Sequence, residues 1–120
     1  MSIKLRIHIT KDILKRSNES GFSSNKSPIA LAVIDVFPNI GIGDKHIYIS
    51  LSKEVAFKAL LPTIAQEFIL VYNGLKYDLR PLLPEFSFEI EIPDEVIQKI
   101  NIDQITSLLK EHKTLELVKG

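Results

Sequence analysis

The chain has 120 residues, of which 45% are hydrophobic and 25% are charged, and its formal net charge is zero. This size and composition are typical of one globular domain, so we treat residues 1–120 as a single domain. Because there is no cysteine, the sequence excludes disulfides, thiolate metal sites and cysteine nucleophiles. The charged start lacks the apolar core of a signal peptide, and no apolar run approaches the roughly 20 residues of a membrane helix. We therefore expect a cytoplasmic protein without a membrane partner.

The charges are unevenly distributed along the chain. Residues 1–58 contain nine basic and five acidic side chains, whereas residues 59–120 contain six basic and ten acidic ones. A basic half is one sign of nucleic-acid binding, but two halves of opposite charge also pair within a fold. The strand patterns favour internal pairing.

Two segments alternate strictly between apolar and polar residues, as half-buried strands do. Residues 3–10 read IKLRIHIT and residues 85–92 read EFSFEIEI. The period of two predicts a strand in each segment, with the isoleucine, leucine and phenylalanine side chains facing inward. The outward residues are basic on the first strand and acidic on the second. We expect antiparallel neighbours whose opposite charges contribute about 0.2–1 kcal/mol per pair.

A short helix and a polar loop follow the first strand. Thr10 is a suitable cap for a helix over residues 11–16, which contains two large apolar side chains to bury. Residues 17–26 read SNESGFSSNK, a composition typical of a loop.

The most apolar segment of the chain lies between two prolines. Ser27 is a good N-cap, Pro28 suits the first helical position, and Pro38 ends any helix at or before Phe37. Only Asp35 is charged between the two prolines. A helix that is apolar on nearly every side is buried, so we expect a central helix around which the other elements pack. Asp35 is expected to reach the surface or a hydrogen-bond partner rather than to act in catalysis.

The region after the central helix allows two interpretations that differ at Pro62. Residues 46–51 alternate as a strand does. Residues 55–72 could form one helix. Pro62 would then lie inside it, and an interior proline destabilises a helix by about 3 kcal/mol. We favour a strand at residues 55–59, which forms a hairpin with the strand at 46–51, followed by a helix from Pro62 to Tyr72. The buried face of this helix is predicted to contain Ile64, Ala65, Phe68 and Val71.

The remaining elements complete the predicted fold. They are an ordered connection at 75–84, a short helix at 93–100, a helix at 104–112 that is capped by Asp103 and buries Ile105, Leu108 and Leu109, and an edge strand or frayed end at 114–118. We predict an α+β fold in which a mostly antiparallel sheet of about four strands packs against the buried central helix and further helices. Residues 93–120 are interpreted as a C-terminal helical extension.

Four features carry a resemblance to known proteins. They are IHIT at residues 7–10, SPIALA at 27–32, a Leu61-Pro62 pair that opens a helix ending near Asn73-Gly74, and EFSFE at 85–89. Over residues 3–92 the chain resembles a group of small, largely uncharacterised accessory proteins of bacteriophages and mobile elements. Relatives often have cysteine where this chain has Ser27, so a thiol-dependent role does not carry over. The resemblance implies a viral or mobile-element accessory protein and brings no catalytic residues.

No pattern of catalytic or metal-binding residues is evident. His8, His46 and His112 lack the spacing of a metal-binding pair, so we expect solvated histidines. The loop before the central helix lacks the second glycine of a phosphate-binding loop. We assign no catalytic residue, metal or cofactor, although an unrecognised enzyme stays among the alternatives.

The sequence favours a non-catalytic binding protein, such as a phage-type inhibitor of a host factor that acts on a protein partner. Self-association is a further expectation. The candidate partner-binding residues are Phe22, Asn25 and Lys26 in the polar loop, and Tyr48 and Lys58 on the outer side of the hairpin.

Two alternatives stay open at this point. One is a binder or sponge for a small anion or a nucleotide, for which the candidate ligand-binding residues are Ser24, Lys26 and Ser27. The other is a nucleic-acid-binding accessory protein. Its candidate basic residues are Lys4, Arg6, Lys11, Lys15, Arg16 and Lys26.

Overall fold

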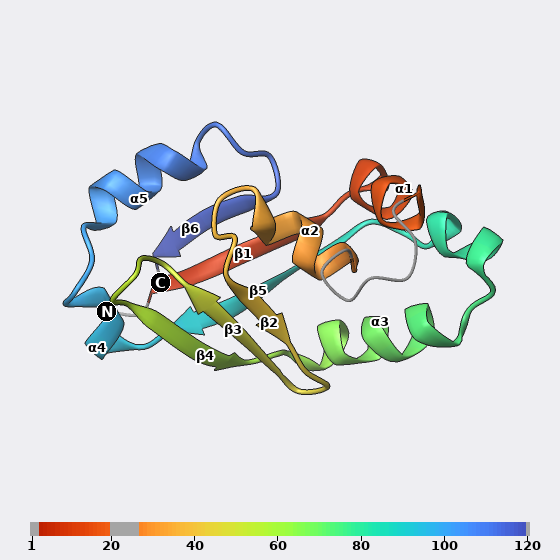
Figure 1. Cartoon of the computed structure of the whole chain (residues 1–120), viewed down its shortest axis with the longest axis horizontal. Helices are drawn as coiled ribbons and strands as arrows, with labels where there is room; N and C mark the ends of the chain where they lie inside the picture. The colour runs from red at the N-terminus through yellow and green to blue at the C-terminus, as the bar shows by residue number, and fades with distance from the viewer. Residues whose placement is uncertain (1–2, 20–26, 120) are drawn as a thin grey trace.

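Six strands form two antiparallel sheets in the computed structural model, which describes residues 3–19 and 27–119 (Figure 1). The strand orders are β5-β1-β6 in the first sheet and β2-β3-β4 in the second. The predicted α+β class and the antiparallel pairing are confirmed. The expectation of a single sheet of about four strands is wrong, because after β4 the chain leaves through a helix and returns as β5 beside β1.

The first sheet is built around β1 (Ile3–Ile9), which pairs with β5 (Phe86–Ile92) and β6 (Leu115–Lys119). The predicted antiparallel pairing of the first strand with residues 86–92 is confirmed. The segment interpreted as a helical extension contains α4 (Asp94–Ile97), α5 (Ile102–Leu109) and then β6. Its last strand therefore occupies the free edge of β1.

The second sheet contains β2 (Ile40–Ile42), β3 (His46–Ser50) and β4 (Ala56–Leu60). The predicted hairpin of β3 and β4 is confirmed, and so is the separate helix α3 (Thr63–Gly74) that follows Pro62. Strand β2 was not predicted, because Gly41 within it and Gly43 after it are typical of a turn. Pairing with β3 provides hydrogen-bond partners for the backbone N–H and C=O groups of β2.

Helix α2 (Pro28–Ile34) is the central helix that the sequence predicts. Ser27 Oγ accepts a hydrogen bond from the Ala30 N–H at 3.4 Å, and every residue of the helix up to Val33 is buried. Asp35 lies exposed at the C-terminal end, 4.0 Å from an Arg16 nitrogen. The predicted N-cap and the surface position of Asp35 are therefore confirmed.

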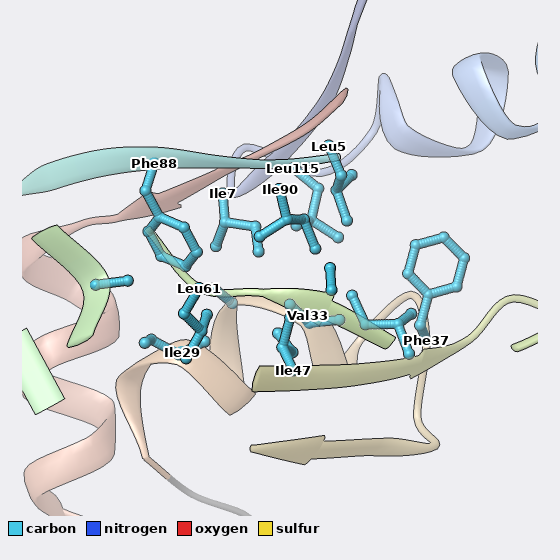
Figure 2. Packing of buried hydrophobic residues seen from close by; sticks show 14 of the residues in the cluster. Leu5, Ile7, Ile29, Val33, Phe37, Ile47, Leu61, Phe88, Ile90 and Leu115 are labelled. Atoms are coloured by element: carbon cyan, nitrogen blue, oxygen red, sulfur yellow. The ribbon is translucent and has the colours of Figure 1, made fainter. Parts of the chain in front are cut away.

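One apolar core lies between the two sheets and includes side chains of α2 (Figure 2). The side chains labelled there are Leu5, Ile7, Ile29, Val33, Phe37, Ile47, Leu61, Phe88, Ile90 and Leu115. They come from both sheets, from α2 and from the residues that follow α2 and β4. The helix and the two sheets therefore exclude water from each other.

The first helix, α1 (Lys11–Glu19), is longer than predicted. Thr10 Oγ1 accepts a hydrogen bond from the Ile13 N–H at 3.2 Å, which confirms the predicted cap. Ser17, assigned to the loop by composition, lies in the helix and is buried, with its hydroxyl 2.7 Å from the Tyr72 hydroxyl. This long-range hydrogen bond satisfies both hydroxyls in the interior.

The buried face of α3 differs from the prediction. Ala65 is buried as expected and Phe68 is half-buried, but Ile64 and Val71 are about half exposed, while Tyr72 is buried. The helix is apolar on several sides, so its periodicity does not select one face. The face is selected by tertiary contacts such as Phe68 against Phe86, whose ring centroids lie 4.7 Å apart.

Three further corrections concern the C-terminal half. The predicted connection at 75–84 contains a 3₁₀ helix, η2 (Tyr77–Leu82). Asn101, not Asp103, caps α5, because its Oδ1 accepts a hydrogen bond from the Gln104 N–H at 3.1 Å. Leu108 is 46% exposed rather than buried.

No helix within the described ranges has both the length and the hydropathy needed to cross a bilayer.

Leu60 and Leu61 provide a matched test of the shared core. Leu61 is fully buried, whereas Leu60, the residue directly before it, is 62% exposed. Leu61→Ala should lower the free energy of unfolding by about 2–5 kcal/mol, because it leaves a cavity between the sheets. Leu60→Ala should change it by no more than about 0.5 kcal/mol. Urea denaturation of both variants checks this, and equal losses would contradict the assigned core.

Candidate functional site

Each sheet has one face in the core and one open face. Along β1, buried and half-buried residues alternate, and along β4 buried residues alternate with exposed ones. Successive side chains of a strand point to opposite faces, so this alternation defines the two open faces of the molecule. Their chemistry differs, and that difference locates the candidate site.

The open face of the first sheet is a network of paired polar side chains. Arg6 donates from Nε and Nη2 to Glu89 Oε2 at 2.9 and 2.7 Å, and from Nη1 to Glu116 Oε1 at 3.1 Å. His8 Nε2 lies 2.9 Å from the same Glu116 oxygen, and His8 Nδ1 lies 2.6 Å from Ser87 Oγ. The charges of this face are therefore largely satisfied within the protein.

This network shifts the titration of two of its members. The hydrogen bonds from His8 and then Arg6 hold the pKa of Glu116 below its ordinary value of 4.5. The hydrogen bonds to Glu89 and Glu116 raise the pKa of Arg6. The predicted facing of basic and acidic residues on β1 and β5 is thus confirmed. Such pairing weighs against Arg6 as a free phosphate contact for nucleic acid.

The open face of the second sheet is centred on Tyr48 and has no such network. Tyr48 is 51% exposed and lies between Gly41 on β2 and Lys58 on β4. Lys58 Nζ lies 5.5 Å from the centroid of the Tyr48 ring, within cation–π distance. His46 lies opposite Leu60 at the next outward position. We call His46, Tyr48, Lys58 and Leu60 the Tyr48 face.

No carboxylate belongs to the three strands that form the Tyr48 face. Within the sheet, its two exposed large side chains, Tyr48 and Leu60, therefore have a lysine and a histidine as neighbours. Glu89 and Glu91 of β5 line the same surface hollow as Lys58 and Leu60. An exposed tyrosine and leucine beside a cation form a surface suited to a partner rather than to catalysis.

A cavity of about 190 Å³ is the second candidate site. It lies where the start of α2, the turn between β2 and β3, and one side of α3 meet. Its lining residues are Ser27, Pro28, Ile29, Ile42, Gly43, Asp44, Phe68, Ile69, Tyr72 and Asn73. The walls are mainly apolar, and a few polar groups border them.

The structure brings some predicted site residues together. Tyr48 and Lys58 are direct cross-strand neighbours, as the predicted hairpin requires. Ser27 caps α2 and also lines the cavity. His8 and His46 lie in different sheets. The other predicted residues, Phe22, Ser24, Asn25 and Lys26, lie outside the described part of the chain.

Leu60 and the cavity were not found by sequence reasoning. Leu60 had a usable signal, because the alternation of AFKAL places it on the same face as Lys58. The cavity had none, since its lining comes from three segments that are far apart in the sequence.

Comparisons with protein-family models, curated proteins and solved structures find no match for this chain. The resemblance to accessory proteins of bacteriophages and mobile elements therefore stays a prediction.

The paired state of Glu116 predicts a pH-dependent contribution to stability. Because its folded-state pKa is lowered, this contribution is present above the ordinary pKa and is lost as the pH falls through the folded-state value. Glu116→Gln should lower the free energy of unfolding at about pH 7 by less than about 1 kcal/mol, since the group is exposed.

Urea denaturation at about pH 7 and about pH 3 checks this prediction. The difference between Glu116→Gln and the unsubstituted chain should be smaller at the lower pH. The exposed Glu111 provides the control, because Glu111→Gln should have no comparable effect at either pH. An undiminished difference at low pH would contradict the assigned ion pairs.

Proposed function

We propose that this protein is a non-catalytic binding protein that docks a protein partner on the Tyr48 face. The observation that carries the proposal is the exposure of Tyr48 and Leu60 on an open sheet face that lacks internal charge pairing. The open face of the first sheet, by contrast, is already occupied by its own ion pairs. A partner that covers the Tyr48 face would therefore bury exposed apolar side chains, whereas a partner on the other face would cover groups that are already paired.

Tyr48 has the properties of an interface anchor. Tyrosine offers a large contact area at a low cost in side-chain entropy, and it is enriched among the residues that dominate binding energy. The contact with Lys58 already restricts the Tyr48 ring in the free protein. Burial of Leu60 under a partner would add about 1.5–3 kcal/mol of hydrophobic stabilisation.

The expected partner surface is apolar at its centre and acidic at its border. The Tyr48 face has Lys58 and His46 at its border and no carboxylate on its strands, so charge complementarity favours aspartate or glutamate opposite them. In a two-fold dimer through this face, the strands of the second copy would offer Lys58 no carboxylate. A different protein is therefore a better partner than a second copy. In the phage-type role that the resemblance implies, this partner is a cytoplasmic host factor, and binding inhibits it.

Two pairs of an exposed leucine and an exposed lysine allow a matched test of the docking surface. One pair is Lys58 and Leu60 on β4, and the other is Leu108 on α5 and Lys110, which directly follows that helix. The partner is first identified by cross-linking in the native host and is then purified. Lys58→Glu with Leu60→Ser should weaken binding at least about 30-fold, as loss of a hot spot does.

The control, Leu108→Ser with Lys110→Glu, should leave the affinity unchanged. Calorimetric titration of the purified partner measures both variants, and circular dichroism verifies that each is folded. Equal weakening by the two double variants, or unchanged binding by the Lys58 variant, would contradict the proposal. A purified partner that proves to be a nucleic acid would also contradict it.

The loop residues Phe22, Asn25 and Lys26 stay a prediction from the sequence as a second contact. Their simultaneous replacement by alanine should weaken the same purified complex while leaving the thermal midpoint nearly unchanged. If the affinity is unaltered, these residues belong to a connector and the Tyr48 face acts without them.

A further inference from the structure

The cavity beside α2 has a size that restricts its ligand. Its volume is about 190 Å³. An apolar cavity of about 150 Å³ is large enough to bind benzene, whereas pockets for drug-sized ligands occupy about 300–1,000 Å³. The cavity therefore accommodates one ring with a short chain, and it is too small for the nucleotide considered from the sequence.

One wall of the cavity is held in place by contacts behind it. Tyr72 is fixed through its hydroxyl, 2.7 Å from Ser17 Oγ, and through its ring, whose centroid lies 4.7 Å from the Arg80 guanidinium carbon. Phe68 stacks on Tyr72 with ring centroids 5.7 Å apart and also contacts Phe86. A wall that is already ordered loses little conformational entropy when a ligand binds.

The polar lining of the cavity favours a cation. Among the residues that the structure describes, Asp44 is the one charged residue that lines the cavity, and it makes no ion pair with any of them. Ser27 Oγ already accepts a hydrogen bond from the Ala30 N–H. A carboxylate beside aromatic rings attracts an ammonium group and repels an anion.

We infer that this cavity binds a small primary amine whose body is a single aromatic or branched aliphatic group. The apolar body contacts Ile42, Phe68 and Ile69, and the ammonium group lies toward Asp44. The inference does not depend on docking at the Tyr48 face, because no residue of that face lines the cavity. A failure of one proposal therefore leaves the other unchanged.

Three probes of matched shape test the ligand chemistry in the full chain. They are phenethylamine, which is a cation at neutral pH, 2-phenylethanol, which is neutral, and phenylacetate, which is an anion. Titrations are followed by NMR through the methyl groups of Ile42 and Ile69. We expect the amine to bind about fivefold more tightly than the alcohol, as an exposed charge pair and a cation–π contact allow, and the anion to bind most weakly.

Two pairs of variants test whether Asp44 causes the preference for the amine and whether the probes bind in the cavity. Asp44→Asn should abolish the preference for the amine over the alcohol, whereas Asp103→Asn on α5 should preserve it. Ile69→Trp fills the cavity and should abolish binding of both probes, whereas Leu70→Trp, on an exposed neighbouring position, should not. Asp44 is exposed, so its variant is expected to fold.

The inference is overturned if none of the three probes shifts the methyl signals of Ile42 and Ile69. It is also overturned if the three probes bind equally, if the anion binds most tightly, or if Asp44→Asn retains the full preference for the amine.

Discussion

The structure depends on the burial of α2 in the apolar core that it shares with both sheets. From Pro28 to Val33 every side chain of this short helix is buried, and Ile29 and Val33 meet core residues of both sheets. A seven-residue helix has little stability by itself, so packing must supply most of it. The same packing fixes the two sheets relative to each other, because α2 and the inner faces of both sheets share one apolar core.

This arrangement leaves two open faces whose charges have different roles. On the first sheet, Arg6 and His8 lie beside Glu89 and Glu116, so part of the charge difference between the halves of the chain is neutralised by strand pairing. On the second sheet, Lys58 has an aromatic ring as its neighbour instead of a carboxylate. The Tyr48 face, which we propose as the docking surface, is therefore the one with fewer charges. A small cavity beside α2 is the separate site for which we infer a ligand.

Much of the local structure could be predicted because local rules decide it. The alternation in residues 3–9 and 86–92, the proline at 62 and the Ser27 cap each restrict the backbone directly. The division into two sheets, the strand β2 and the buried face of α3 could not, because long-range contacts decide them. The candidate sites likewise divide into one that local rules predict and one that long-range contacts form. Tyr48 and Lys58 are predictable from a hairpin, whereas the cavity needs three distant segments to be placed first.

The central claim, that α2 joins both sheets into one rigid unit, is tested most directly by native-state hydrogen exchange. Strands β1 and β3 are each central in their sheet, so each strand forms hydrogen bonds with a neighbour on both sides. We predict that the slowest amides of both strands exchange with the same free energy, equal to that of global unfolding, and that Val33→Ala lowers both values equally. Exchange of the β3 amides through a lower-energy opening that leaves the β1 amides protected would contradict the account.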